Sequence, residues 1–283
     1  MEIAVLSGKG GTGKTTVSLN LARAAEKVEL LDCDVEEPNS HIFLNPKTPS
    51  EERIGVEYPI IDKKKCINCG ACGRFCRFNA FISSPSLTIS MPELCHSCGG
   101  CEMVCPEKAI SYDIREIGSI LKGTSKNINL SWGLLDVGQL SGVKIIEKLR
   151  KAPPTAPLRI TDCPPGTSCS TVEAAEGANL AIIVAEPTPF GISDMLMVVE
   201  MLQTLKVPMA LIINKAGLGD DKLHKLCEER NIPILGEIPF SREAAAIYAR
   251  GDLLYEASDE FRKTFTDLYA AVTAKIQEGT VWQ

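Results

Sequence analysis

The sequence predicts an α/β protein, with a doubly wound, largely parallel sheet that is interrupted by a small inserted α+β unit. Two observations carry this prediction. Short apolar runs alternate with amphipathic segments along most of the chain, as in consecutive βαβ units. Between about residues 58 and 112 this rhythm stops, and eight of the 12 cysteines crowd into residues 66–105. We therefore expect one domain over residues 1–57 and 113–283 and a second over residues 58–112.

The expected elements follow from these patterns in chain order. The first strand is expected at residues 2–7, with a helix at 14–27 and a strand at 28–34 after it. After the insert, strands are expected near 127–138, 158–163, 179–186, 208–215 and 232–239. The helices between and after these strands are expected at 141–151, 168–177, 191–205, 220–230 and 241–250.

A last helix is expected from Asp259 to about Glu278. Its apolar stripe consists of Phe261, Phe265, Leu268, Val272 and Ile276. The stripe fits either a packed helix or a helix that lies on a membrane surface. The polar face is mixed in charge rather than basic, which favours the packed helix.

Composition narrows the class of protein. The chain has 283 residues and a net charge of −6, which argues against a general nucleic-acid binder. No signal peptide precedes the first strand, and no apolar stretch reaches the length of a membrane span. We expect a cytoplasmic protein with no membrane insertion. Thiols stay reduced in that compartment, so the crowded cysteines indicate metal or cluster ligation rather than disulfides.

The segment Gly8-x4-Gly13-Lys14-Thr15 matches the P-loop pattern between a strand and a helix. Such a loop wraps the phosphates of a nucleotide with its backbone N–H groups, so we expect ATP or ADP here. Lys14 should reach the β- and γ-phosphates, and the Thr15 hydroxyl should bind Mg²⁺. The expected phosphate-binding residues are Gly8, Gly10, Gly11, Thr12, Gly13, Lys14, Thr15 and Thr16.

A second lysine in "GKGGTGKTT", Lys9, makes the sequence resemble the deviant Walker A ATPases, the superfamily of MinD, ParA, Mrp and the nitrogenase iron protein. The resemblance implies a nucleotide-dependent dimer, either a homodimer or a heterodimer with a related ATPase. In that family this lysine crosses the dimer interface to the partner's nucleotide, and Lys9 is expected to do the same. A solvated loop lysine is the alternative.

The same resemblance assigns roles to residues in four further segments. In "LLDCDVEEPN", Asp34 should orient or activate the attacking water, with Asp32 as a supporting group. In "ITDCPPG", Asp162 should hold Mg²⁺ through water, and the Gly166 N–H should sense the γ-phosphate. In "INK" and "IPF", Asn214 and Pro239 should lie at the adenine, although both residue types are also common in turns.

The insert contains an internal repeat. Each half has the spacing C-x2-C-x2-C-x3-C, and the second half begins 29 residues after the first. This run resembles that of bacterial two-cluster ferredoxins, in which the fourth cysteine of each half ligates the other cluster. The resemblance implies one [4Fe–4S] cluster on Cys66, Cys69, Cys72 and Cys105. It implies a second on Cys76, Cys95, Cys98 and Cys101. Tetrahedral zinc is the alternative.

The remaining chemistry-bearing residues of the insert and body give weaker signals. His96 lies between ligands and is expected to be a surface residue, and Arg77 stands where ferredoxins usually have proline. Cys33 and Cys227 fit small buried groups. Cys163 and Cys169 flank "PPGTS", and a cluster-ligating cysteine of the nitrogenase iron protein also follows this segment. Cys169 is therefore a candidate redox or cluster thiol, with an incidental packed thiol as the alternative.

Three functions compete for this combination. The first is an ATP-hydrolysing protein that couples its dimer cycle to electron transfer through two clusters, toward an unidentified redox or cluster-accepting protein. The second is an iron–sulfur assembly or carrier ATPase of Mrp type. Such carriers have a late C-x2-C pair, where this chain has only Cys227. The third is a positioning switch like MinD or ParA with redox-sensing clusters. The eight ligands in ferredoxin order favour the first.

Overall fold

The computed structural model describes residues 1–278, which form a nine-stranded sheet in the order β11-β10-β9-β1-β8-β2-β7-β6-β3. All pairings from β11 to β7 are parallel, which confirms the predicted doubly wound sheet. The parallel strands are β1 (Glu2–Leu6), β2 (Val28–Asp32), β7 (Ile128–Leu135), β8 (Leu158–Asp162), β9 (Leu180–Ala185), β10 (Met209–Ala216) and β11 (Ile234–Pro239).

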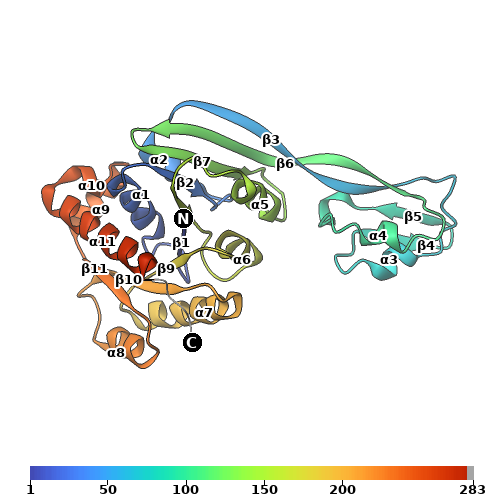
Figure 1. Ribbon diagram of the computed structural model, residues 1–283. Helices are drawn as coiled ribbons and strands as arrows, with labels where there is room; N and C mark the ends of the chain where they lie inside the picture. The colour runs from blue at the N-terminus through green and yellow to red at the C-terminus, as the bar shows by residue number, and fades with distance from the viewer. Residues whose placement is uncertain (279–283) are drawn as a thin grey trace.

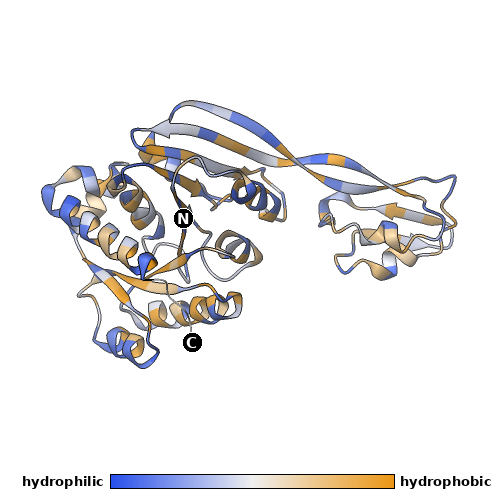
Figure 2. Ribbon diagram, viewed as in Figure 1, coloured by the Kyte–Doolittle hydropathy of each residue, from blue (hydrophilic) through white to orange (hydrophobic). Residues whose placement is uncertain are grey.

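Helices cover both faces of the sheet (Figure 1). One face carries α5 (Val143–Lys151), α6 (Cys169–Ala175), α7 (Pro189–Leu205) and α8 (Lys222–Glu229). The other carries α1 (Lys14–Ala24), α9 (Arg242–Ala249), α10 (Leu254–Ala257) and α11 (Asp259–Gln277), and the short α2 (Ser40–Leu44) follows β2. The strands buried on both faces are mostly apolar, and Figure 2 shows the apolar residues gathered between the layers. A buried ion pair between Glu29 of β2 and Arg159 of β8 is an exception.

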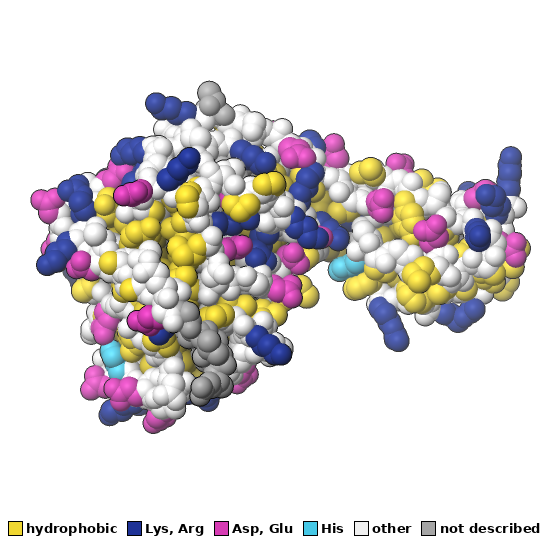
Figure 3. Space-filling model, in the orientation of Figure 1, with side chains coloured by type: hydrophobic (Ala, Val, Ile, Leu, Met, Phe, Trp, Pro, Cys, Tyr) yellow, Lys and Arg dark blue, Asp and Glu magenta, His cyan; other side chains and the backbone are white. Residues whose placement is uncertain are grey.

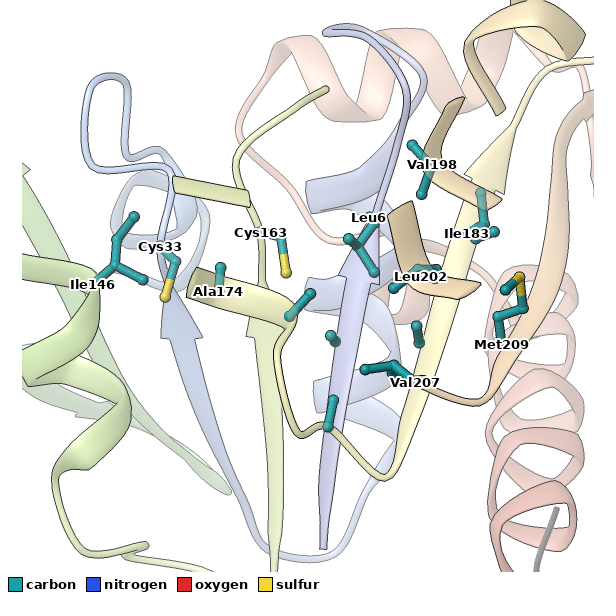
Figure 4. Packing of buried hydrophobic residues seen from close by; sticks show 14 of the residues in the cluster. Leu6, Cys33, Ile146, Cys163, Ala174, Ile183, Val198, Leu202, Val207 and Met209 are labelled. Carbon is teal, nitrogen blue, oxygen red and sulfur yellow. The ribbon is translucent and has the colours of Figure 1, made fainter. Parts of the chain in front are cut away.

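On the face covered by α5 to α8, side chains of the strands pack directly against side chains of the helices. Figure 4 shows Leu6 of β1 and Ile183 of β9 beside Val198 and Leu202 of α7, all of them fully buried. On the opposite side, α11 packs against α1 and β11. Its Phe265 is fully buried in that core. The expected C-terminal helix is therefore a packed helix, and no helix within residues 1–278 combines the length and apolarity needed to cross a bilayer.

The two remaining strands of the sheet form a long arm that the sequence did not predict. β3 (Lys47–Ile61) and β6 (Ile110–Ser125) pair antiparallel along most of their length. β6 also pairs with β7, but only from Gly118, opposite Leu135, onward. The ladder over residues 110–116 and 55–61 thus continues beyond Leu135, the carboxyl end of β7. The arm therefore projects from the carboxyl edge of the sheet, the edge that also carries the loop after β1.

A small lobe lies at the far end of the arm (Figures 1 and 3). It contains α3 (Ala71–Phe75), β4 (Phe81–Ser84), β5 (Leu87–Ser90), a 3₁₀ turn at Pro92–Leu94 and α4 (Gly100–Met103). Its only core is a small cluster of buried residues, among them Ala80, Phe81 and Ile110. The predicted domain boundaries at residues 58 and 112 fall inside the two strands of the arm.

The lobe's backbone repeats as its sequence does. Left-handed conformations, with φ between 48° and 74°, occur in three pairs: Asn68 and Ser97, Gly70 and Gly99, and Asn79 and Lys108. Each pair is separated by the 29 residues of the cysteine repeat, as are the first residues of α3 and α4. The two halves are therefore structural copies of one another.

Candidate functional site

The P-loop joins β1 to α1 at the carboxyl edge of the sheet. Gly13, the residue before α1, has φ of 94°, and a Cβ there would lie 2.1 Å from Asn214 Nδ2. Only glycine meets both conditions without strain. No side chain caps the N-terminus of α1 within the described chain, so its first N–H groups and the helix dipole are available to an anion.

Lys14 lies at the bottom of this loop, and 6% of its surface is exposed. Its Nζ is 3.3 Å from Asp162 Oδ1 and 3.8 Å from Asp34 Oδ2. Burial lowers the pKa of the Lys14 ammonium, but the charges of Asp162, Asp34 and Asp32 outweigh burial and raise it. Lys14 therefore stays charged while it is buried.

Asp162 is fully buried at the end of β8. Its Oδ1 accepts hydrogen bonds from Lys14 and from the Ser18 hydroxyl, at 3.0 Å from the latter, while Oδ2 has no partner within residues 1–278. A buried carboxylate oxygen without a partner is costly, and carboxylate oxygens are ligands that Mg²⁺ accepts. Sequence reasoning missed Ser18, although its position one helical turn after Lys14 was a usable signal.

Asp32, at the end of β2, supports the loop that follows it. Its carboxylate accepts the N–H groups of Asp34, Asn39 and Ser40 at 3.0–3.2 Å, which fits the expected supporting role. Burial and then the charge of Asp162 raise the pKa of Asp32 to about 7. Burial also raises the pKa of Asp34, to about 6, against the opposing effect of Lys14.

These carboxyl groups make the nucleotide-free protein sensitive to pH. Between pH of about 4 and 7, the folded protein keeps a proton on Asp32 that the unfolded chain releases, so stability falls as pH rises through that window. We expect wild type to lose about 2–3 kcal/mol more than Asp32→Asn between pH 5 and pH 8. Urea unfolding at both pH values measures this. Asp220→Asn, at an exposed site, is the control, and parallel slopes for wild type and Asp32→Asn would contradict the prediction.

The P-loop opens into a pocket of about 420 Å³. Predicted site residues that line it are Lys9, Gly10, Gly11, Gly13, Lys14, Thr15, Thr16, Asp34, Asn214 and Pro239. The structure thus brings together the phosphate loop, one acidic residue and the two residues expected at the base. Gly8 packs instead against Asp194 of α7, and Thr12 is buried behind the loop.

Two predicted residues, Gly166 and Asn214, make contacts that the sequence did not indicate, and a third, Lys9, has a free ammonium group in the described chain. The Gly166 N–H donates to the Ser7 carbonyl at 2.9 Å, so a γ-phosphate must replace that acceptor. Asn214 donates to the Thr12 carbonyl at 2.7 Å and so braces the P-loop, and its contact with adenine stays a prediction. The Lys9 ammonium has neither an ion pair nor a hydrogen bond within the described residues, whereas Lys215 in the same pocket pairs with Glu186 at 2.6 Å.

The eight cysteines of the lobe line two separate pockets. One, of about 390 Å³, is lined by Cys76, Cys95, Cys98 and Cys101. A second, smaller pocket is lined by Cys66, Cys69, Cys72 and Cys105. These are the two ligand sets implied by the ferredoxin resemblance, with Cys76 and Cys105 exchanged between the halves. The exchange of Cys76 into the other pocket follows from the position of α3. This helix contains Cys72, which lines one pocket, and ends just before Cys76, which lines the other.

The surroundings of the sulfur atoms suit a negatively charged cofactor. The Ala80 and Ala109 N–H groups donate to Cys76 Sγ and Cys105 Sγ at 3.4 and 3.3 Å, at equivalent positions of the repeat. Within residues 1–278, no three side chains of His, Cys, Asp or Glu are close enough to hold one metal ion. The cluster assignment therefore rests on the two pockets and the repeat. His96 is exposed, as expected, and stacks on Phe78 with ring centroids 3.8 Å apart.

The other cysteines divide by burial. Cys33, Cys163 and Cys227 are buried, and Figure 4 shows Cys163 beside Leu6 of β1 and Cys33 beside Ile146 of α5. Burial raises the pKa of the Cys163 thiol, so this group stays protonated. Cys169 is exposed at the first residue of α6, and its role as a redox or cluster thiol stays a prediction.

Comparison with known protein families matches residues 3–254 to the CobQ/CobB/MinD/ParA nucleotide-binding domain. The chain is 33% identical over 278 residues to an uncharacterized protein of Methanocaldococcus jannaschii, with 95% of each chain covered. It is 25% identical over 301 residues to an iron–sulfur cluster carrier protein of Pyrococcus abyssi, covering 98% of this chain and 87% of that protein.

Among solved structures, the fold is similar to the cell division ATPase MinD of Pyrococcus furiosus. The TM-score is 0.61, the sequence identity is 17%, and the alignment covers 97% of this chain and 98% of that one. At this identity the likeness concerns the fold alone.

Proposed function

The chain belongs to the CobQ/CobB/MinD/ParA family of nucleotide-binding domains, and from this premise we propose that it is an ATP-hydrolysing dimer that gates electron transfer. The electrons would pass through two [4Fe–4S] clusters in the lobe to a redox partner protein. Nucleotide state would control the orientation of the lobe relative to the body. The partner subunit is either a second copy or a related ATPase.

The nucleotide chemistry follows from the charges around Lys14. A bound γ-phosphate offers Lys14 a stronger, charge-assisted partner than Asp34, which it contacts only at 3.8 Å. Lys14 and the P-loop N–H groups would then hold the phosphates, and Thr15 and, through water, Asp162 would hold Mg²⁺. Burial already raises the pKa of Asp34, and loss of the Lys14 contact would remove the charge that opposes this effect, so Asp34 is suited to orient or deprotonate the attacking water. Lys9, which has no partner in its own chain as described, would supply charge to the nucleotide of the partner subunit.

The lobe supplies the ligands for the redox groups. Cys66, Cys69, Cys72 and Cys105 would hold one cluster, and Cys76, Cys95, Cys98 and Cys101 the other. When bound, these clusters would supply one-electron transfer at low potential. The chain's own contribution is the set of N–H donors to the thiolates and a small apolar shell around them.

The coupling between nucleotide and clusters is supported by the hydrogen bonds at the base of the arm. Val35, the residue after Asp34, accepts the Leu135 N–H at 2.8 Å at the end of β7. Next to it, the Asp136 N–H donates to the Ile117 carbonyl of β6 at 2.9 Å. Asp136 also pairs with Arg53 of β3. A movement of the Asp34 loop on ATP binding would therefore reach both strands of the arm through directly bonded groups.

The test is an anaerobic potentiometric EPR titration of the reconstituted protein with and without Mg-ATP. We expect Mg-ATP to shift the potential or the signal shape of at least one cluster, because coupling between two sites is reciprocal. Lys9→Ala is the matched control. It should bind ATP with nearly unchanged affinity, lose hydrolysis by about 10³-fold, and keep the shift, because the route from the Asp34 loop to the arm lies within one chain. Clusters that do not respond to Mg-ATP in wild type would count against the gating function.

The carrier proteins among the relatives favour a second candidate, delivery of clusters to other proteins. In that case the wild-type protein should transfer iron and sulfide to an apo-ferredoxin faster with Mg-ATP, and lose its own EPR signal as it does so. Retention of both clusters under those conditions favours electron transfer.

A further inference from the structure

The two halves of the lobe carry different side chains at two neighbouring pairs of equivalent positions. In the β4–β5 hairpin, Ser83 lies directly opposite Thr88. Where the end of β3 pairs with the start of β6, Pro59 lies directly opposite Tyr112. Positions 59 and 88, and positions 83 and 112, are separated by the 29 residues of the repeat. The arm therefore supplies the second half with its own version of the hairpin, with different side chains.

Thr88 carries a buried hydroxyl group with no partner, and the Ser83 hydroxyl lies close to Cys72. Thr88 is 5% exposed, and its Oγ1 makes no hydrogen bond within residues 1–278. Burial raises the pKa of the Cys72 thiol, and the nearby Ser83 hydroxyl opposes that effect. Residues directly opposite on an antiparallel pair share one face of the hairpin. An unpaired buried hydroxyl costs free energy, which a hydrogen-bond acceptor at this face would recover.

Thr88 lies at the pocket of the first ligand set, and Ser83 lies next to one of the cysteines that line it. Thr88 lines the pocket together with Cys66, Cys69, Cys72 and Cys105. A Cβ added to Gly73 would lie 3.1 Å from Ser83 Oγ, which places that hydroxyl beside the residue after Cys72. Both hydroxyls therefore lie on the face of the hairpin that is turned toward the cysteine sulfur atoms, where an acceptor would have to be.

The equivalent face of the other half is arranged differently. The Tyr112 hydroxyl donates to the Gly99 carbonyl at 3.1 Å and lies 3.6 Å from Cys101 Sγ, so it already has partners. Pro59, opposite Tyr112, has no polar side chain. In the described lobe, the pocket of Cys66, Cys69, Cys72 and Cys105 thus has the free hydroxyl of Thr88 beside that of Ser83, and the other pocket has only the engaged hydroxyl of Tyr112.

We propose that Thr88 and Ser83 donate hydrogen bonds to sulfur atoms of the cluster held by Cys66, Cys69, Cys72 and Cys105, and make it the higher-potential site of the two. The inference rests on the proposed function, because it needs the clusters. Hydrogen bonds to cluster and thiolate sulfur stabilise the more negative, reduced state and so raise the reduction potential. Electrons that enter the lobe would settle at this site.

The experiment compares Thr88→Val, Ser83→Ala and Tyr112→Phe with wild type in a potentiometric EPR titration after anaerobic reconstitution. For Thr88→Val, we expect the ratio of reduced to oxidised cluster at a fixed potential to fall about tenfold at the higher-potential site, equal to 59 mV for one electron. Ser83→Ala should shift the same site in the same direction. Tyr112→Phe should leave both potentials nearly unchanged, because the Tyr112 hydroxyl donates its proton to the Gly99 carbonyl. Thr88→Ser, which keeps the hydroxyl, should restore the wild-type potential.

The content of iron and acid-labile sulfide per chain shows whether the proposed function fails or only the inference about the two hydroxyls. A wild-type protein that assembles no clusters overturns both this inference and the proposed function. Two assembled clusters whose potentials are the same in wild type, Thr88→Val and Ser83→Ala overturn the inference and leave the proposed function standing. So does a shift of the lower-potential site in Thr88→Val.

Discussion

Replacing Lys14 by alanine is expected to abolish ATP hydrolysis and to destabilise the nucleotide-free protein. Lys14 is the buried cation that faces Asp162 and Asp34, and Asp162 already has one oxygen without a partner. Removal of one member of a buried ion pair costs about 3–5 kcal/mol, because the other charge stays buried. Hydrolysis should fall by about 10³-fold, the loss typical of removing a group that stabilises transition-state charge.

Two further variants separate stability from phosphate binding. Lys14→Arg keeps the positive charge but replaces the compact ammonium by a larger, planar guanidinium. We therefore expect near wild-type stability and loss of hydrolysis. Lys126→Ala removes an exposed lysine that pairs with Glu256 at 2.7 Å, and such surface pairs contribute about 1 kcal/mol or less. Thermal unfolding with and without Mg-ATP measures both effects. The prediction fails if Mg-ATP still raises the Tm of Lys14→Ala as much as that of wild type.

The parts of the nucleotide site that the sequence predicted are those set by local rules. The P-loop is a continuous pattern, and its place between a strand and a helix is readable from periodicity. Asp32 and Asp162 end neighbouring parallel strands, and carboxyl ends of parallel strands meet at one edge, so the two had to lie close together. The pairing of Lys215 with Glu186 depends on a contact between segments distant in sequence, which no local pattern encodes. Ser18 did have a local signal, its position one helical turn after Lys14.

The arm escaped prediction for a physical reason. Residues 113–116 of β6 bury no side chain, so polar and apolar side chains alike face solvent there, and Ile114 is 68% exposed. A strand that buries neither face has no period-2 pattern of hydrophobicity to read. The contact of Val35 with Leu135 at the base of the arm could not be predicted either, because it depends on the order of the strands.

The lobe shows the opposite case, in which the sequence predicted more than secondary structure. The repeat of 29 residues gave the equivalence of the two halves, and the backbone conformations at Asn68 and Ser97 follow it. The sequence did not reveal that the arm provides one of the two hairpins. Because the arm forms the strand pair of the second half, Tyr112 occupies the position there that Ser83 occupies in the first half.

Pairs of cysteine replacements are expected to give opposite iron contents depending on which pocket they affect. In Cys76→Ser/Cys98→Ser, both changes fall in one pocket, so the other ligand set stays complete and about four irons per chain should remain. In Cys98→Ser/Cys105→Ser, one change falls in each pocket, so iron should drop close to zero. If each half instead ligated its own cluster, the two results would be reversed, because Cys98 and Cys105 belong to the same half.

Iron and acid-labile sulfide after anaerobic reconstitution decide between these outcomes, with Cys169→Ser as the matched control for an exposed cysteine outside the lobe. That variant should keep about eight irons, since two complete ligand sets remain. The lobe has a very small apolar core, so loss of both clusters should also leave it open to proteolysis. The body has its own two cores and should keep its thermal shift with Mg-ATP. A lobe that resists proteolysis without iron would mean that the hairpins and the short helices hold the cysteines in place by themselves.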